Sequence, residues 1–296
     1  MRSLRIPAYA KVNLSLEILG RRSDGYHELR TIFQTISLHD TLELSLTRRR
    51  GIQLECDDPT LPLGRENLVW RALDALHRAL HLRSGIRAVL YKRIPAGRGL
   101  GGGSSDAAAA LIGLLRLTRS MLPAPRLLRI ASRLGADVPF FLEGGRALGV
   151  GRGDQTFPLP DLPRRAVLVV SPAAISVATR DAYAWVSPTL TGRRPALKIQ
   201  SFCALCWSPQ WSALSNSFEK AVFARHPRLR TIKRKLLHGG AAEAALAGSG
   251  SAVFALFPDP AQARRTARLF PDDRVFTVRT ISRSEYLRAL GWPGVS

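Results

Sequence analysis

The sequence predicts an α+β fold in two domains, and three features of the chain indicate it. The chain opens with alternating, strand-like segments before any helical pattern begins. Strands and helices then follow one another without the regular βα alternation of a doubly wound sheet. Finally, the chain has a segment with three closely spaced prolines, Pro158, Pro160 and Pro163. We place the domain boundary there, between residues 1–157 and 158–296.

The first strand is predicted from a period of two. Apolar and polar residues alternate from Val12 to Ile18, as expected of a half-buried strand. Lys11 and Asn13 therefore lie on the same polar face.

Further strands and a first helix follow. Strand patterns at 31–38 and 41–46 flank Asp40, which is predicted to form the turn between them. Apolar residues then recur at helical spacing over 69–80, directly after Asn67, a good N-cap residue. The first half of the chain is thus expected to bury a helix against a sheet.

A strand over 86–94 ends at Pro95 and leads into a glycine-rich loop. The loop, 97–103, is followed by an alanine- and leucine-rich helix over 107–117. Closely spaced glycines let backbone N–H groups approach an anion, and the helix N-terminus adds its positive dipole end. We therefore expect phosphate to bind here.

Other phosphate-binding motifs fit this loop less well. Gly97, Gly99 and Gly102 formally match G-x-G-x-x-G, but no acidic residue stands between Asp106 and Asp137 at the spacing that a Rossmann fingerprint requires. The loop also lacks the lysine of a Walker A motif, and the chain has no H-R-D or D-F-G element of a protein kinase.

The remaining elements include a helix over 125–134 with Gly135 at its C-terminal end. A buried strand over 166–170, a polar connection over 187–212, further helices and a strand over 252–257 complete the second half.

Composition narrows the class of partner. Forty-four basic against 22 acidic residues give a formal net charge of +22, which favours nucleic acid, anionic lipid or a phosphate-rich small molecule. The basic residues are scattered and only 7% of residues are aromatic, so a nucleic-acid-binding face is the weaker alternative. No long apolar run or apolar leader occurs, and we expect a soluble, cytoplasmic protein that does not bind a membrane.

The three cysteines form no disulfide framework. Cys203 and Cys206 make a lone C-x-x-C without a second pair of ligands, so we expect buried thiols rather than a zinc site.

Three segments, in order, resemble the motifs of the GHMP kinases, which include galactokinase, homoserine kinase, mevalonate kinase and phosphomevalonate kinase. They are Pro7–Leu14, Pro95–Ser105 and Ala247–Ser251. The segments Arg22–Leu29 and Gly135–Phe141 are similar to those of the branch that phosphorylates 4-diphosphocytidyl-2-C-methyl-D-erythritol. The resemblance extends over most of the chain.

The resemblance implies a two-domain GHMP kinase fold with an N-terminal ATP-binding domain and the active site in the interdomain cleft. It implies transfer of the γ-phosphoryl group of ATP, with Mg²⁺, to the hydroxyl on carbon 2 of this cytidine diphosphate sugar alcohol, a step of the non-mevalonate isoprenoid precursor pathway. A GHMP kinase that acts on homoserine or a mevalonate-type acceptor is the alternative, against which the Asp24–His27 segment argues.

Carried over to this chain, the resemblance assigns two catalytic residues. Asp137 would take the proton of the acceptor hydroxyl, and Lys11 would hold Asp137 ionised or steady the attacked phosphate. A surface Lys11 and a helix-capping Asp137 are the plain structural alternatives.

The resemblance also assigns binding residues. Those for ATP are the loop residues Pro95, Ala96, Gly97, Arg98, Gly99, Leu100, Gly101, Gly102, Gly103, Ser104 and Ser105. Those for the acceptor are Asn13, Tyr26, His27, Thr179 and Tyr183.

Individual roles follow from the chemistry of these groups. Tyr26 is expected to stack on the cytosine base and His27 to hydrogen-bond its edge, while Gly248, Ser249 and Gly250 close the site from the second domain. Ser104 and Ser105 are expected to cap the helix and to touch the phosphates or Mg²⁺. Arg98 stands where the family often has a small residue, and its side chain either approaches phosphate or faces solvent.

Overall fold

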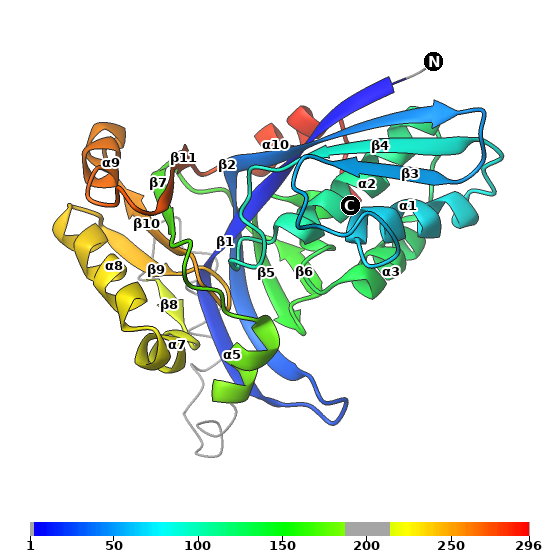
Figure 1. Cartoon of the computed structure of the whole chain (residues 1–296). Helices are drawn as coiled ribbons and strands as arrows, with labels where there is room; N and C mark the ends of the chain where they lie inside the picture. The colour runs from blue at the N-terminus through cyan, green and yellow to red at the C-terminus, as the bar shows by residue number, and fades with distance from the viewer. Residues whose placement is uncertain (1–2, 187–213, 296) are drawn as a thin grey trace.

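The computed structural model describes residues 3–186 and 214–295, which form two sheets with helices packed on them (Figure 1). The predicted connection over 187–212, with Cys203 and Cys206, lies outside the described residues. Among the described helices, none combines the length and the apolar character needed to cross a membrane.

The first sheet is built around two long antiparallel strands, β1 and β2. Its spatial order is β3-β4-β2-β1-β8, and β5 pairs with both β2 and β6. The strands are β1 (Ser3–Arg21), β2 (His27–Thr47), β3 (Ile52–Cys56), β4 (Gly85–Tyr91), β5 (Arg146–Gly151), β6 (Gln155–Pro158) and β8 (Ser215–Asn216).

The predicted turn at Asp40 is wrong, because β2 passes through this residue without interruption. Asp40 is fully buried, and its carboxylate accepts hydrogen bonds from the backbone N–H groups of Arg93 and Ile94 and from the ammonium of Lys92. A charged residue stays inside the sheet here because these partners replace its water.

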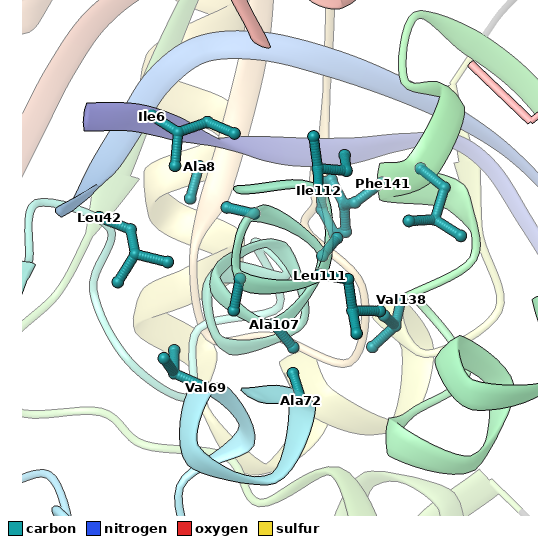
Figure 2. Packing of buried hydrophobic residues seen from close by; sticks show 14 of the residues in the cluster. Ile6, Ala8, Leu42, Val69, Ala72, Ala107, Leu111, Ile112, Val138 and Phe141 are labelled. Carbon is teal, nitrogen blue, oxygen red and sulfur yellow. The ribbon is translucent and has the colours of Figure 1, made fainter. Parts of the chain in front are cut away.

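The helices of the first half cover this sheet, with α2 at the centre. They are α1 (Leu68–Ala79), α2 (Gly102–Thr118), α3 (Ala124–Leu134) and α4 (Phe140–Glu143). Figure 2 shows α2 surrounded by side chains of β1, such as Ile6, and of α1, such as Val69. The helix is buried on nearly all sides, which explains why its sequence is alanine- and leucine-rich all round.

The second sheet has the order β11-β7-β10-β9 and is antiparallel throughout. Its strands are β7 (Ala166–Ser171), β9 (Glu243–Leu246), β10 (Val253–Phe257) and β11 (Arg274–Arg279), and its helices α8 (Pro227–His238) and α9 (Pro260–Ala267) pack on one face. The short helices α5 (Thr179–Val186) and α7 (Glu219–Arg225) lie beside it (Figure 1).

The two sheets are joined by a shared apolar cluster. Every residue of β7 is buried, because its alternate side chains face different clusters. Leu168 and Val170 pack with the helices of the second sheet, whereas Val167 and Val169 pack with Val12 and other residues of β1 and β2. This apolar cluster fixes the position of the second sheet relative to β1 and β2.

The chain ends on the first domain's core. Helix α10 (Arg283–Leu290) buries Tyr286 and Leu290 in the cluster that contains α2. The Tyr286 hydroxyl donates a hydrogen bond to the carbonyl of Phe141 in α4. The domain boundary at residues 157/158 stays a prediction.

Candidate active site

A cavity of about 1350 Å³ opens between the first sheet with its helices and the α5 and glycine segments of the second half. It brings together the ends of segments that are far apart in the chain: β1, the start of β2, the glycine loop, the loop after α3, and α5. All the predicted site residues line it except Ser105 and Gly250.

Lys11 and Asp137 meet at the centre of this cavity. The Lys11 Nζ lies 3.3 Å from an Asp137 carboxylate oxygen and donates a 2.8 Å hydrogen bond to Asn13 Oδ1. Asn13 Nδ2 in turn donates to Thr31 Oγ1 at 2.7 Å. The Lys11 side chain is only 5% exposed, whereas Asp137 is 31% exposed, so the lysine is fixed and the carboxylate faces the cavity.

The glycine loop combines positive φ angles with close contacts that leave little space for a Cβ atom. Gly97, Gly99 and Gly101 all have positive φ, between +67° and +79°. A Cβ on Gly99 would lie 1.8 Å from the carbonyl oxygen of Ala247, and one on Gly101 would contact Phe141 and Lys11 at 2.9–3.0 Å. The loop therefore lies pressed between β1, α4 and the second domain's glycine segment.

The predicted capping role of Ser104 and Ser105 is wrong, because α2 begins at Gly102, which places both serines inside the helix. Its N-cap is Gly101, and no side chain caps the first turn. Ser105 is buried and its hydroxyl has no hydrogen-bond partner in the described part of the chain, whereas Ser104 lines the cavity. Uncapped N–H groups at the start of a helix are suited to an anion.

At the other end of the cavity, aromatic side chains gather. The His27 ring stacks on Tyr183 with centroids 4.7 Å apart and an interplanar angle of 18°. Tyr26 is 57% exposed, and the guanidinium of Arg152 lies 5.0 Å from its ring centroid. The Thr179 and Ser249 hydroxyls are hydrogen-bonded at 3.1 Å, which links α5 to the second glycine segment.

Two of these aromatic groups have shifted acid–base properties. Burial, and secondarily the charge of Arg21, lowers the pKa of His27. Burial, with a smaller contribution from the Asp137 carboxylate, raises the pKa of the Tyr183 hydroxyl. At neutral pH His27 is therefore a neutral imidazole, with one nitrogen that donates and one that accepts.

A buried charge cluster under the glycine loop was missed by the sequence analysis. Lys92 donates to the carboxylates of Asp40 and, at 2.7 Å, of Asp106. Burial is the largest cause that raises the pKa of Asp106, to about 8. Burial opposes the charged form of Lys92, but the two carboxylates outweigh it and raise its pKa. The one available signal was an aspartate directly before the alanine- and leucine-rich part of a helix.

The cavity offers few protein oxygens for a metal ion. Among residues 3–186 and 214–295, no group of three or more histidine, cysteine, aspartate or glutamate side chains could hold one. Ser104 and Asp137 do line the cavity near the loop, and the Ser104 hydroxyl lies beside Gly135, two residues before Asp137. This donor set fits Mg²⁺, which usually takes one or two protein ligands and completes its shell with phosphate and water.

Comparison with known proteins identifies the family. The sequence matches the GHMP kinases N terminal domain over residues 67–145 and the GHMP kinases C terminal domain over residues 204–270. A 4-diphosphocytidyl-2-C-methyl-D-erythritol kinase of Solibacter usitatus is 46% identical over 294 residues, which cover 98% of this chain and 92% of the relative. Its counterpart in Geobacter sulfurreducens is 40% identical, over 95% of this chain and 100% of the relative.

A solved structure agrees with these relatives. The crystal structure of a 4-(cytidine 5'-diphospho)-2C-methyl-D-erythritol kinase matches with a TM-score of 0.78 and 37% identity, over 94% of this chain and 99% of that one. The α+β fold and the resemblance inferred from the motifs are both confirmed. The chain belongs to the family of 4-diphosphocytidyl-2-C-methyl-D-erythritol kinases, a branch of the GHMP kinases.

Proposed function

We propose that this protein transfers the γ-phosphoryl group of ATP to the hydroxyl on carbon 2 of 4-diphosphocytidyl-2-C-methyl-D-erythritol, in the non-mevalonate isoprenoid precursor pathway. The observation that carries the proposal is the Lys11–Asp137 pair, 3.3 Å apart, in the same cavity as a glycine loop that begins a helix. The names of the relatives supply the acceptor.

In the proposed reaction, the acceptor oxygen forms a bond to the γ-phosphorus as the bond from that phosphorus to the β,γ-bridging oxygen breaks, and ADP leaves. Asp137 takes the proton of the acceptor hydroxyl. Lys11, held by Asn13, neutralises Asp137 in the free enzyme and orients its open oxygen toward the cavity. Positioning and charge neutralisation supply most of the rate in phosphoryl transfer.

ATP is assigned to the glycine loop, whose uncapped N–H groups would receive its phosphates. Mg²⁺ would enter with the nucleotide, with the Ser104 hydroxyl as a protein ligand, which leaves the Asp137 carboxylate free to take the proton. When bound, the ion would neutralise charge on the phosphates.

For the acceptor we propose that Tyr26 offers a face to cytosine and that His27 reads its edge. Stacking of His27 on Tyr183 fixes the plane of the imidazole, and Thr179 is held by Ser249. A cytidine diphosphate carries enough negative charge to be drawn into this cavity, which Arg21, Arg152 and Arg180 also line. A cytoplasmic location, and the absence of nucleic-acid binding, stay predictions.

The test is mass spectrometry of the products of the purified protein with ATP and Mg²⁺ and each of three acceptors in turn: the cytidine substrate, homoserine and mevalonate. We expect one added phosphoryl group on the cytidine substrate alone. Phosphorylation of homoserine or mevalonate in preference to it would refute the acceptor assignment and leave the GHMP kinase chemistry intact.

A further inference from the structure

The glycine loop carries one charged side chain, Arg98, which lines the cavity and forms hydrogen bonds to residues far along the chain. Arg98 Nη1 donates a 2.8 Å hydrogen bond to Ser251 Oγ, and Nη2 donates to the Ala173 carbonyl at 3.2 Å. Both partners adjoin strands of the second sheet, Ala173 after the end of β7 and Ser251 before the start of β10. The guanidinium therefore connects the glycine loop with the second sheet at the site where the phosphates of ATP are proposed to bind.

The Ser251 hydroxyl can only accept from Arg98, because its single hydrogen is already donated elsewhere. Ser251 is fully buried, and its hydroxyl donates to the Ile175 carbonyl at 2.6 Å. Since a hydroxyl has a single hydrogen, Ser251 must use a lone pair to accept from Arg98. The result is a directed chain from Arg98 to Ser251 to Ile175.

The backbone supports the same connection. The Ala252 N–H donates to the Arg98 carbonyl at 3.2 Å, and Gly99 packs directly on the Ala247 carbonyl. A loop this rich in glycine loses much conformational freedom when it is ordered. Contacts already made in the free protein remove that cost from ATP binding.

We infer that Arg98 is a positioning residue, which fastens the glycine loop to Ser251 and to the 173–175 segment so that the loop is ordered before ATP binds. The inference rests on the proposed function only in assigning ATP to this loop. The 173–175 segment leads into α5, which carries Thr179 and Tyr183, so the same chain connects the nucleotide end of the cavity with the acceptor end.

The test is a double-mutant cycle on nucleotide binding. The dissociation constant of a non-hydrolysable ATP analogue with Mg²⁺ is measured by calorimetry for wild type, Arg98→Ala, Ser251→Ala and the double variant. We expect each single variant to bind about tenfold more weakly, the low end for a hydrogen bond from a charged and partly exposed donor. The double variant should bind no more weakly than Arg98→Ala, because both changes break the same chain.

Two further variants separate positioning from direct contact with phosphate. Arg98→Lys keeps the charge but has a single ammonium for two partners, so we expect an intermediate loss. Arg93→Ala removes an exposed arginine near the loop that is outside the residues found to line the cavity, and should bind within about twofold of wild type. The kcat at saturating ATP should change little in the control Arg93→Ala, whereas the Arg98 and Ser251 variants should raise the KM for ATP.

Three results would overturn the inference: unchanged affinity in Arg98→Ala, a loss in Arg98→Ala with none in Ser251→Ala, and full additivity in the double variant. The second would indicate that Arg98 touches phosphate directly. Thermal melting checks that each variant is folded, and Ser251→Ala with Arg98→Lys keeps the test decisive if Arg98→Ala does not fold. Failure of wild type to phosphorylate the cytidine substrate would refute the proposed function alone, because the analogue affinities are measured without an acceptor.

Discussion

Replacing Gly99 by alanine tests how tightly the two glycine segments are pressed together. The new Cβ would lie 1.8 Å from the Ala247 carbonyl oxygen, and ordinary contact begins at 3.4 Å, so the loop must move by roughly 1.6 Å. Overpacking of this kind costs about 1–3 kcal/mol, and the positive φ adds about 1–2 kcal/mol. A shift this large takes the loop N–H groups out of hydrogen-bond range of the phosphates, so ATP should bind at least about tenfold more weakly.

Gly97→Ala is the matched control. Gly97 also has positive φ, but apart from its neighbours in the chain no atom of residues 3–186 and 214–295 lies within 4 Å of its added Cβ. It should show the conformational cost alone, with ATP affinity within about threefold of wild type. Calorimetric titration with a non-hydrolysable ATP analogue measures both variants, and urea unfolding gives their stability. Equal loss of affinity in the two variants would refute the argument from packing.

Two further pairs of variants test the residues proposed to bind cytosine and the buried cluster of Asp40, Lys92 and Asp106. His27→Ala should reduce the ratio of kcat/KM for the cytidine substrate to that for the uridine substrate by about tenfold or more. Tyr26→Ala should lower kcat/KM for the two substrates about equally. A proportional loss on both substrates in His27→Ala would show that His27 does not recognise the base. Asp106→Asn should be tolerated, because the new NH₂ can replace the Asp106 oxygen that has no partner in the described residues. In Asp40→Asn, by contrast, the new NH₂ must face another donor, either Lys92 or a backbone N–H. This variant should lower the free energy of unfolding by about 1–3 kcal/mol. The raised pKa of Asp106, about 8, means that the folded protein binds a proton that the unfolded chain releases, so stability is lost as pH rises through this value. Urea midpoints at about pH 6 and about pH 9 should differ less in Asp106→Asn than in wild type, and an equal difference would contradict the assignment.

Local sequence patterns predicted much of the fold. Asn67 caps α1 by accepting a 2.8 Å hydrogen bond from the Val69 N–H, as its position before an apolar repeat indicated. The glycine loop, the α3 helix that ends at Gly135 and the buried strand β7 were found for similar reasons. In each case the signal and its partner lie within a few residues of each other.

What the sequence did not reveal depends on distant partners. Asp40 resembled a turn residue because its compensating charge, Lys92, lies 52 residues away. Arg98 is separated by 153 residues from Ser251, so nothing near the loop indicated where its side chain goes. The motifs were sufficient to predict the site residues. The contacts that position these residues depend on packing between distant parts of the chain, which no local pattern indicates.

The central claim is that Asp137 accepts the proton of the acceptor hydroxyl while Lys11 fixes its position. The most direct measurement is kcat of Asp137→Asn on the cytidine substrate, with ATP-analogue affinity measured on the same preparation. Asparagine keeps the shape of the side chain but not its basicity, so kcat should fall by roughly 10²-fold or more while nucleotide affinity stays near that of wild type. Turnover close to that of wild type, in a variant that binds the analogue normally, would contradict the account.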